Sequence, residues 1–289
     1  MLEPSEALAA IGVLPDAEIE PAMAALQLAR LDRPGDDWRD ASDHLSVLAR
    51  ESASIGAVMA GRSGEARVGA LAGLLHARHD YRGDTETYDA LDNANLIAVV
   101  RRRRGLPVAL GLIWLHCLRA AGWDAHGIDF PGHFLLALRT GSAGPGGPGG
   151  PGRLVARQGR LLIDPFAQGI TLGNARLLAM LESRGQDQPG LSPGITRPMS
   201  TRAVLLRLQR NLVQRRLAAG EIEAALGSLE GMLLIAPDDM TNWLDAAELN
   251  RLLGRPHKAG RCLERVIDLA PDSPAARIAR QRLGDLRPG

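Results

Sequence analysis

Five residues recur at one fixed spacing near the C-terminus, and this repeat constrains the fold more than any other feature of the chain. Each residue returns after 34 positions: Gly220 and Gly254, Ala225 and Ala259, Leu229 and Leu263, Pro237 and Pro271, Asp238 and Asp272. In each unit the glycine is placed to end a first helix, the small alanine lets a second helix pack closely, and the proline ends that helix. The sequence therefore predicts stacked helix pairs in this region.

This spacing is the period of the tetratricopeptide repeat. The pattern predicts one helix pair over 201–219 and 222–235, a second over 240–253 and 257–269, and a capping helix over 273–286. An unrelated array of helical hairpins is the alternative. Tetratricopeptide repeats present a concave surface, so we expect a protein or peptide partner to bind there.

A segment rich in Pro, Gly and Ser at 183–198 is typical of a domain boundary. We place the boundary near Arg197, which predicts a first domain over 1–196 and a repeat domain over 197–289. A second Gly/Pro-rich segment, at 141–152, lies between two predicted strands and is not followed by a helix. We therefore expect a loop insertion there.

The first domain has the pattern of a helix-rich α+β fold. We expect amphipathic or apolar helices over four ranges: 16–31, 40–53, 64–79 and 94–103. A further helix over 108–121 is apolar on nearly all sides, which predicts that it is buried. Short extended segments follow it at 125–130, 133–138, 154–158 and 160–163. Together they predict a small antiparallel sheet packed on the buried helix.

Charge and cysteine content narrow the possible partners. The net charge is +1, and only Cys117 and Cys262 are present. A charge so near zero creates no field for nucleic acid or anionic lipid, so we expect neither a direct nucleic-acid partner nor a membrane. Two distant cysteines build neither a disulfide framework nor a zinc site, and no metal or cofactor is expected. Glu3 and Glu6 stand where a signal peptide needs positive charge, which predicts a cytoplasmic protein.

His133 and Asp164 are the polar residues best placed for chemistry. His133 begins one predicted strand and Asp164 ends another. If the two strands are neighbours, the imidazole meets a carboxylate that orients it and stabilises its protonated form. From the spacing alone, a capping histidine and a turn-forming aspartate before Pro165 remain the alternative.

Four short segments carry a resemblance to a known family: 93–96 (NANL), 103–110 (RRGLPVAL), 130–135 (FPGHFL) and 162–166 (LIDPF). In this order, and followed by the repeats, they resemble bacterial transglutaminase-like proteins with tetratricopeptide repeats, a family named as regulators of sirC expression. The resemblance covers the chain from about residue 40 to the C-terminus. The insertion at 141–152 looks peculiar to this sequence.

The resemblance implies a papain-like transglutaminase fold, in which a cysteine at the N-terminus of the buried helix attacks an acyl group. A histidine on the next strand acts as base, and an aspartate orients it. The resemblance implies these two roles for His133 and Asp164, and a cleft-supporting role for Asn93 and Arg103. The nucleophile position falls at or beside Pro107, where no Cys, Ser or Thr is found.

The other candidate residues have simpler explanations. Cys117 lies nearly three turns into the apolar helix, where a cysteine is expected to be a core residue rather than a reactive thiolate. His76 and His79 share a helix face but lack a third ligand, so we expect solvated histidines rather than a metal site. The four arginines at 101–104 are expected to form a solvated helix end.

Two hypotheses for function follow from these features. The first is a protein-interaction or regulatory module, a pseudoenzyme whose transglutaminase-like cleft holds a peptide while the repeats hold a partner. The alternative is a hydrolase or acyl-transfer enzyme in which a dyad of His133 and Asp164 activates water or a substrate group near Pro107. Oligomeric state cannot be inferred from the sequence.

Overall fold

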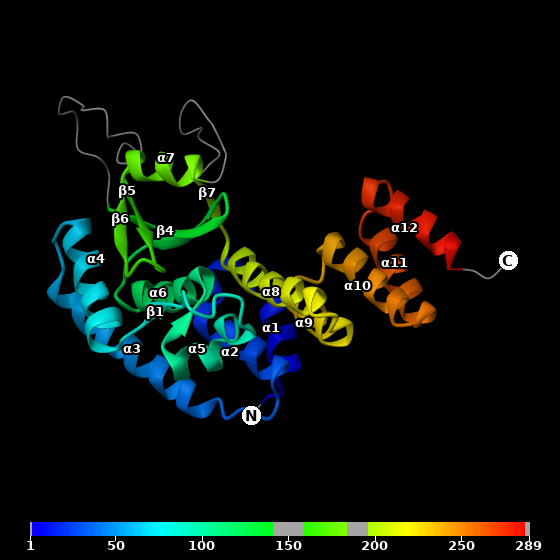
Figure 1. Ribbon diagram of the computed structural model, residues 1–289, viewed down its shortest axis with the longest axis horizontal. Helices are drawn as coiled ribbons and strands as arrows, with labels where there is room; N and C mark the ends of the chain where they lie inside the picture. The colour runs from blue at the N-terminus through cyan, green and yellow to red at the C-terminus, as the bar shows by residue number, and fades with distance from the viewer. Residues whose placement is uncertain (1, 141–158, 184–195, 287–289) are drawn as a thin grey trace. The chain divides into compact units, whose positions relative to one another are not determined.

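The computed structural model describes residues 2–140, 159–183 and 196–286 (Figure 1). Their contacts form two compact units. The sheet unit comprises Ile19–Leu26 and Gly35–Leu205, and the repeat unit comprises Met1–Glu18, Gln27–Pro34 and Leu206–Gly289. Within the described ranges, no helix combines the length and the apolarity needed to cross a bilayer.

The sheet unit is built on five antiparallel strands in the order β6-β5-β4-β3-β7. The strands are β3 (Ala125–Phe130), β4 (His133–Arg139), β5 (Arg160–Asp164), β6 (Ile170–Leu172) and β7 (Arg197–Met199). The helix-rich α+β fold with a small antiparallel sheet is thus confirmed. The predicted strand at 154–158 and the insertion at 141–152 lie outside the described residues. The two strands of this sheet that the sequence did not indicate, β6 and β7, have three residues each, too few for a periodic signal.

Strand β4 lies at the centre of the sheet, and its alternating side chains separate two packing faces. Phe130 pairs with His133 across the Pro131-Gly132 turn, where Gly132 adopts a left-handed φ of 64°. One face buries Ile128, Phe130, Leu135, Ala137, Leu162 and Leu172 against Leu177 and Leu181 of helix α7 (Asn174–Glu182). Figure 1 shows α7 on one side of the sheet and helix α6 (Pro107–Ala120) on the other.

Helix α6 is the buried helix that the sequence predicts. Every residue from Pro107 to Leu118 is buried. Pro107 is the first residue of the helix, where a backbone N–H would have no partner within the helix. Gly122 follows the end of the helix with a left-handed φ of 73°. Gly111 lies directly beneath Phe134, because a Cβ at this position would come within 2.2 Å of the phenylalanine ring. The contact lets the helix approach the sheet closely.

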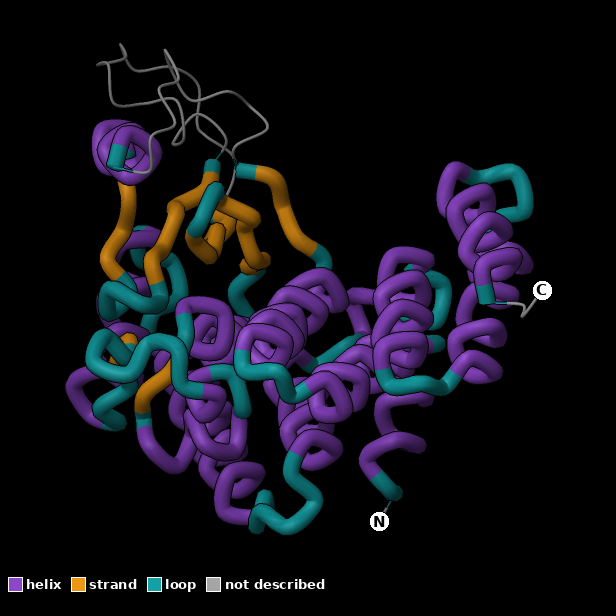
Figure 2. Tube along the Cα trace, turned by 45° about the vertical axis from the view of Figure 1, so that its right-hand side comes forward, coloured by secondary structure: helices purple, strands orange, loops and turns teal. Residues whose placement is uncertain are grey.

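The remaining helices of the sheet unit surround α6. They are α3 (Arg39–Val58), α4 (Gly64–Ala72), a π-helical segment (Gly73–Arg78) and α5 (Leu96–Arg102). A short parallel pair joins β1 (Arg82–Gly83) to β2 (Arg104–Gly105) just before α6. Figure 2 shows the sheet strands gathered in one place, with helices forming most of the described chain.

The predicted helix over 16–31 is divided in the structure. A short 3₁₀ turn, Asp16–Glu18, precedes helix α2 (Pro21–Asp32). Proline is accepted in the first turn of a helix but removes a hydrogen bond from a helix interior, so Pro21 starts a new helix rather than continuing one. The helical assignment is confirmed, and its first boundary is wrong.

The repeat unit confirms the predicted helix pairs. The pairs are α8 (Thr201–Ala218) with α9 (Ile222–Ile235) and α10 (Met240–Leu252) with α11 (Pro256–Leu269), followed by α12 (Pro274–Asp285). Gly220 and Gly254, the repeated glycines, adopt left-handed φ angles of 75° and 69° at the ends of α8 and α10. This conformation explains why glycine recurs at both positions.

The repeat unit also contains a helix that the sequence did not indicate, α1 (Pro4–Gly12). It packs on α9, and Gly12 approaches so closely that a Cβ there would meet the carbonyl oxygen of Leu234. The end of α2 joins the same unit, where Asp32 accepts a hydrogen bond from buried Arg216. The compact units therefore differ from the expected domains 1–196 and 197–289, which stay a prediction.

Substituting Gly111 by alanine tests how closely α6 must approach the sheet. The added methyl group would overlap Phe134, so we expect the free energy of unfolding to fall by about 1–3 kcal/mol. Gly69→Ala is the matched control, because Gly69 lies within α4 and a Cβ there meets nothing within 4 Å. The control should be neutral or stabilising in urea unfolding followed by circular dichroism. Equal stability of the two variants would contradict this account of the packing.

Candidate functional site

The structure brings His133 and Asp164 together at one end of the sheet. His133 is the first residue of β4, Asp164 is the last residue of β5, and the two strands are antiparallel neighbours. The imidazole Nε2 lies 3.0 Å from the carboxylate Oδ2. The side chains are 12% and 9% exposed, so the contact is largely shielded from water. The sequence predicted this meeting on the condition that the strands were neighbours.

Asp164 is held firmly in place by its own turn. Its Oδ1 accepts hydrogen bonds from the backbone N–H groups of Phe166 (2.9 Å) and Ala167 (3.1 Å). Burial disfavours the carboxylate, but the hydrogen bond and charge of His133 and the two backbone donors outweigh burial, so the pKa of Asp164 is lowered. The carboxylate therefore accepts a hydrogen bond from Nε2, which fixes the orientation of the imidazole.

The start of α6 lies against the start of β4. Gly111, one turn after Pro107, packs on Phe134, the residue that follows His133. Leu106 precedes the helix in an extended conformation and donates its N–H to the carbonyl of Asn93 at 2.9 Å. The proline at the first helical position carries neither an attacking group nor an N–H for stabilising an oxyanion.

Cys117 does not compensate for this proline. Its side chain is completely buried on α6. Burial raises the pKa of the Cys117 thiol to about 12, and a hydrogen bond with Ser52 offsets this only in part. The thiol is therefore protonated at neutral pH and unreachable for a substrate, as expected of a core cysteine.

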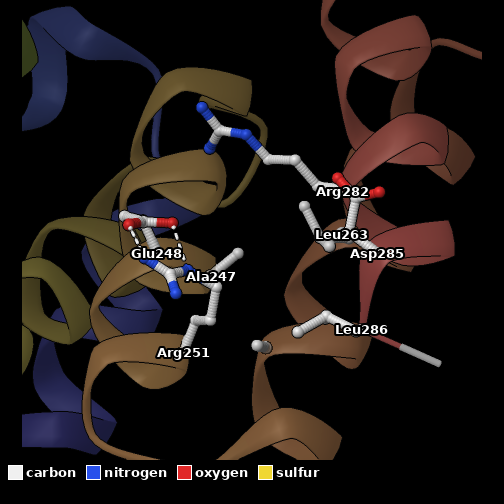
Figure 3. Close-up of a pocket in the computed structure, with 8 residues that line it drawn as sticks. Ala247, Glu248, Arg251, Leu263, Arg282, Asp285 and Leu286 are labelled. Atoms are coloured by element: carbon white, nitrogen blue, oxygen red, sulfur yellow. Dashed lines mark hydrogen bonds and ion pairs between the residues drawn. The ribbon is translucent and has the colours of Figure 1, made fainter. Parts of the chain in front are cut away.

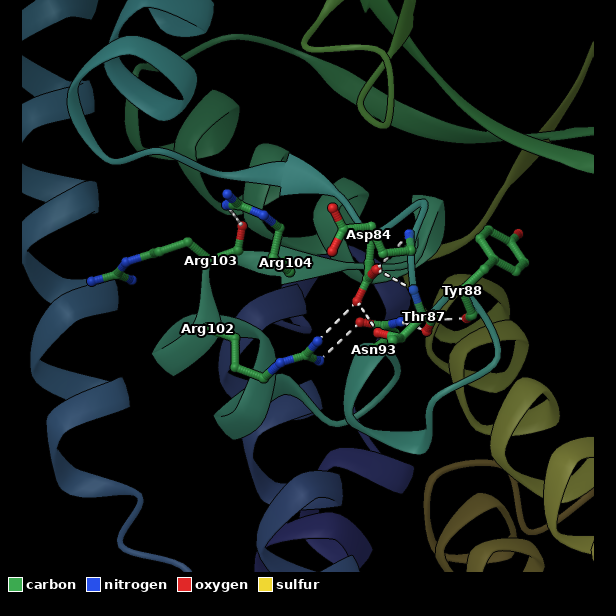
Figure 4. A network of polar contacts seen from close by, with 8 residues as sticks. Asp84, Thr87, Tyr88, Asn93, Arg102, Arg103 and Arg104 are labelled. Atoms are coloured by element: carbon green, nitrogen blue, oxygen red, sulfur yellow. Dashed lines mark hydrogen bonds and ion pairs between the residues drawn. The ribbon is translucent and has the colours of Figure 1, made fainter.

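Asn93 is fully buried and connects two segments near the start of α6 (Figure 4). Its Nδ2 donates to the carbonyl oxygens of Thr87 (2.6 Å) and Tyr88 (3.3 Å). Its Oδ1 accepts from Nη1 of Arg102 at 3.0 Å. These bonds hold the loop 84–88 against the end of α5, which is a structural position compatible with the cleft-supporting role implied for Asn93.

Asp84 is the centre of the same network, although the sequence did not single it out. Its Oδ1 accepts from the backbone N–H groups of Glu86 (3.1 Å) and Thr87 (2.8 Å), and its Oδ2 accepts from the Thr87 hydroxyl (2.7 Å) and from Arg102 (2.8 Å). Burial opposes the charge, but these donors outweigh it and hold the pKa of Asp84 well below its usual range. The acidic residue before Thr-Glu-Thr is an Asx-turn signal that could have identified it.

The loop 84–88 is tied to the turn that holds Asp164. The ring of Tyr88 lies 6.0 Å from that of Phe166, edge to face. Gly83 lies against the same ring, since a Cβ there would come within 2.5 Å of Phe166 Cε2. The loop held by Asp84 and Asn93 thus packs on Phe166, in the turn that follows Asp164.

Arg103 holds a second group of polar side chains together. The backbone of Arg103 is in the left-handed conformation, with φ at 57°. Its Nη1 donates to the Tyr81 hydroxyl at 2.7 Å. Its Nη2 lies 3.2 Å from Nδ1 of His44. Burial, followed by the charges of Arg103 and His79, lowers the pKa of His44 to about 4, so the neutral ring accepts this bond. The supporting role of Arg103 stays a prediction.

Two expectations about solvated side chains are wrong. His76 is buried with Nδ1 donating to the Tyr81 carbonyl, and His79 Nε2 lies 2.6 Å from a Glu51 oxygen. Arg102 and Arg103, in the run of four arginines, are held in the networks above. Sequence spacing could not show this, because the partners come from α3 and from the loop before α5.

In the described part of the chain, no group of three or more His, Cys, Asp or Glu side chains is placed to hold a metal ion.

Replacing Asp84 by asparagine tests the network of Figure 4. The variant keeps the shape of the side chain but leaves Arg102 without its charged partner, so we expect a loss of about 1–3 kcal/mol in the free energy of unfolding. Glu86→Gln is the matched control, because Glu86 is exposed and contributes its backbone N–H rather than its side chain. A control as unstable as Asp84→Asn would show that charge in this loop, rather than the network, matters.

The lowered pKa of Asp164 predicts a pH dependence of stability. A carboxyl whose folded pKa lies below its unfolded value stabilises the fold fully above about pH 4, and this contribution is lost as the pH falls through the folded pKa. At neutral pH, Asp164→Asn should therefore be less stable than the natural protein by about 1.5–3 kcal/mol in urea unfolding. The difference should shrink as the pH is lowered below about 4. If the difference in stability between the two proteins stays constant below about pH 4, the lowered pKa of Asp164 is contradicted.

Comparison with known proteins gives matches to two parts of the chain. The sequence profile described as "Transglutaminase-like superfamily" matches residues 37–210, more than half of the chain, and the profile "Tetratricopeptide repeat" matches residues 212–284. The first match includes the dyad, the network of Asp84 and all of α6. The second covers the end of α8, helices α9 to α11 and most of α12. No solved structure matches the chain.

Curated relatives cover most of the chain. A UPF0162 protein of Xylella fastidiosa is 26% identical over 224 residues, which is 76% of this chain and 74% of the relative. A UPF0162 protein of Pseudomonas aeruginosa is 30% identical over 196 residues (68% and 66%), and one of Vibrio cholerae is 25% identical over 225 residues (78% and 77%). With the profile match over residues 37–210, these likenesses show that the chain belongs to the transglutaminase-like superfamily and carries C-terminal tetratricopeptide repeats.

Proposed function

We propose that this protein is a binding and regulatory module, a transglutaminase-like pseudoenzyme that does not form an acyl-enzyme. The observation that carries the proposal is Pro107 at the first position of α6. In transglutaminase-like folds the attacking cysteine stands at the N-terminus of this helix, and a thiolate there is what forms the acyl-enzyme. Proline offers no substitute.

The dyad has a use in such a module. The hydrogen bond to Asp164 holds the imidazole of His133 in one orientation. His133 is partly exposed at the hairpin end of β4, where a polar group of a peptide could meet it. Retention of His133 and Asp164 without a nucleophile is therefore compatible with binding alone.

The repeats supply the second half of the proposal. Stacked helix pairs present side chains from successive helices on one surface, and such surfaces hold peptide segments of partner proteins. We propose that the repeats of this chain bind a protein or peptide partner. A role in regulating expression, which the resemblance to regulators of sirC expression implies, would then be indirect and depend on that partner.

The second candidate function is that of a hydrolase or acyl transferase. It is favoured by the 3.0 Å contact between His133 Nε2 and Asp164, since a histidine oriented by a carboxylate is the arrangement typical of a general base. General-base catalysis without a covalent nucleophile needs only a water and a positioned acyl group. This candidate differs from the first in one measurable respect, turnover.

The full chain should be tested with p-nitrophenyl esters for hydrolysis, and with a glutamine peptide and a fluorescent primary amine for acyl transfer. We expect rates no higher than those of His133→Ala, because no residue at the start of α6 can form an acyl-enzyme. His126→Ala is the matched control, a half-buried histidine on the neighbouring strand β3. Turnover that His133→Ala abolishes and His126→Ala preserves, with unchanged circular dichroism, would establish the enzyme instead.

A further inference from the structure

A pocket of about 550 Å³ lies among the last three helices of the repeat unit, α10, α11 and α12 (Figure 3). Its apolar lining comes from Ala247, Ala259, Leu263 and Leu286, and its polar lining from Glu248, Arg251, Arg282 and Asp285. Of the apolar residues, Ala247, Ala259 and Leu263 belong to the buried core of the helices. The pocket therefore has an apolar floor and a charged rim.

Two of the charges on the rim neutralise each other. Arg251 donates to both oxygens of Glu248, from Nη2 at 2.6 Å and from Nε at 3.0 Å. The hydrogen bond from Arg251 lowers the pKa of Glu248, and the charges of Arg251 and Arg282 act in the same direction. A bidentate pair of this kind leaves little charge for a ligand.

Arg282 is not part of a pair of this kind. Its guanidinium makes no hydrogen bond or ion pair with any residue in the described ranges, and Figure 3 shows its side chain extending from α12 across the mouth of the pocket toward α10. Asp285 follows one turn later on α12 and likewise has no ion pair among the described residues. Its negative charge weakens the attraction of this site for an anion without neutralising the guanidinium.

We propose that this pocket binds a partner peptide that places an apolar side chain on the floor and the carboxylate of a neighbouring acidic residue on Arg282. The proposal rests on the proposed function, since it names the partner chemistry of the repeats. Burial of an apolar side chain against Ala247 and Leu263 supplies affinity, at roughly 25 cal/mol for each Å² removed from water. The planar guanidinium fork matches a carboxylate and supplies selectivity.

The experiment uses the full chain and end-blocked, fluorescein-labelled Gly/Ser peptides. The first probe has a leucine flanked by glutamates. The second has the leucine flanked by glutamines, the third has it flanked by lysines, and the fourth has serine in place of leucine between glutamates. Binding is measured by fluorescence anisotropy at low and at high salt. We expect the first probe to bind most tightly, and added salt to weaken it because a rim charge is screened.

Variants on α12 locate the site. Arg282→Gln should weaken the first probe by about 1.4-fold to fivefold, the range for one exposed ion pair, and Asp285→Asn should strengthen it. Arg277→Gln is the matched control, because it removes the same charge from an exposed position of the same helix outside the pocket. Leu286→Ala should reduce the preference for leucine over serine.

Three results would overturn the proposal: no binding of any probe, equal binding of the lysine and glutamate probes, or an equal effect of Arg282→Gln and Arg277→Gln. None of these results would bear on turnover, so the proposed function would stand on its own test. Conversely, turnover that depends on His133 would overturn the proposed function and leave the peptide preference of the pocket measurable.

Discussion

The close approach of α6 to the sheet is the constraint on which the rest of the sheet unit depends. The helix is apolar on nearly all sides, so it lowers its free energy only when neighbours cover every face. Gly111 allows the sheet to cover one face of the helix, because its missing side chain leaves room for the ring of Phe134. Once the helix and β4 are in contact, the hairpin that begins β4 and the turn that ends β5 must lie near the first turn of the helix.

The polar contact at the end of the sheet is held independently of the first residue of α6. The contact between His133 and Asp164 depends on strand pairing and on the turn after Asp164, not on the residue at position 107. The network of Asp84 and Asn93 supports that turn through Phe166. Proline at the start of α6 satisfies helix geometry and carries no attacking group.

Much of the fold could be predicted because its signals are local. The 34-residue period determines the repeat helices, and the glycines at 220 and 254 adopt the left-handed conformation that the pattern requires. Strands β3 and β4 were predictable as short extended segments on either side of Pro131-Gly132. The site was predictable only in part: His133 and Asp164 flank recognisable strands, whereas Asp84, Arg102 and His44 function through partners distant in sequence. The spacing of residues along the sequence does not show which of these distant side chains will meet.

The sequence by itself determined most of the helix and strand pattern, the repeat period, the burial of α6 and the lack of Cys, Ser or Thr beside Pro107, because each depends on residue type and short-range periodicity. Only the tertiary structure decided which polar side chains meet. It joined α1 and the end of α2 to the repeat helices, buried His76 and placed Arg102 on Asp84. The physical reason is that a buried polar group must find a partner, and the partner is whichever group the packing of distant segments brings within hydrogen-bonding distance.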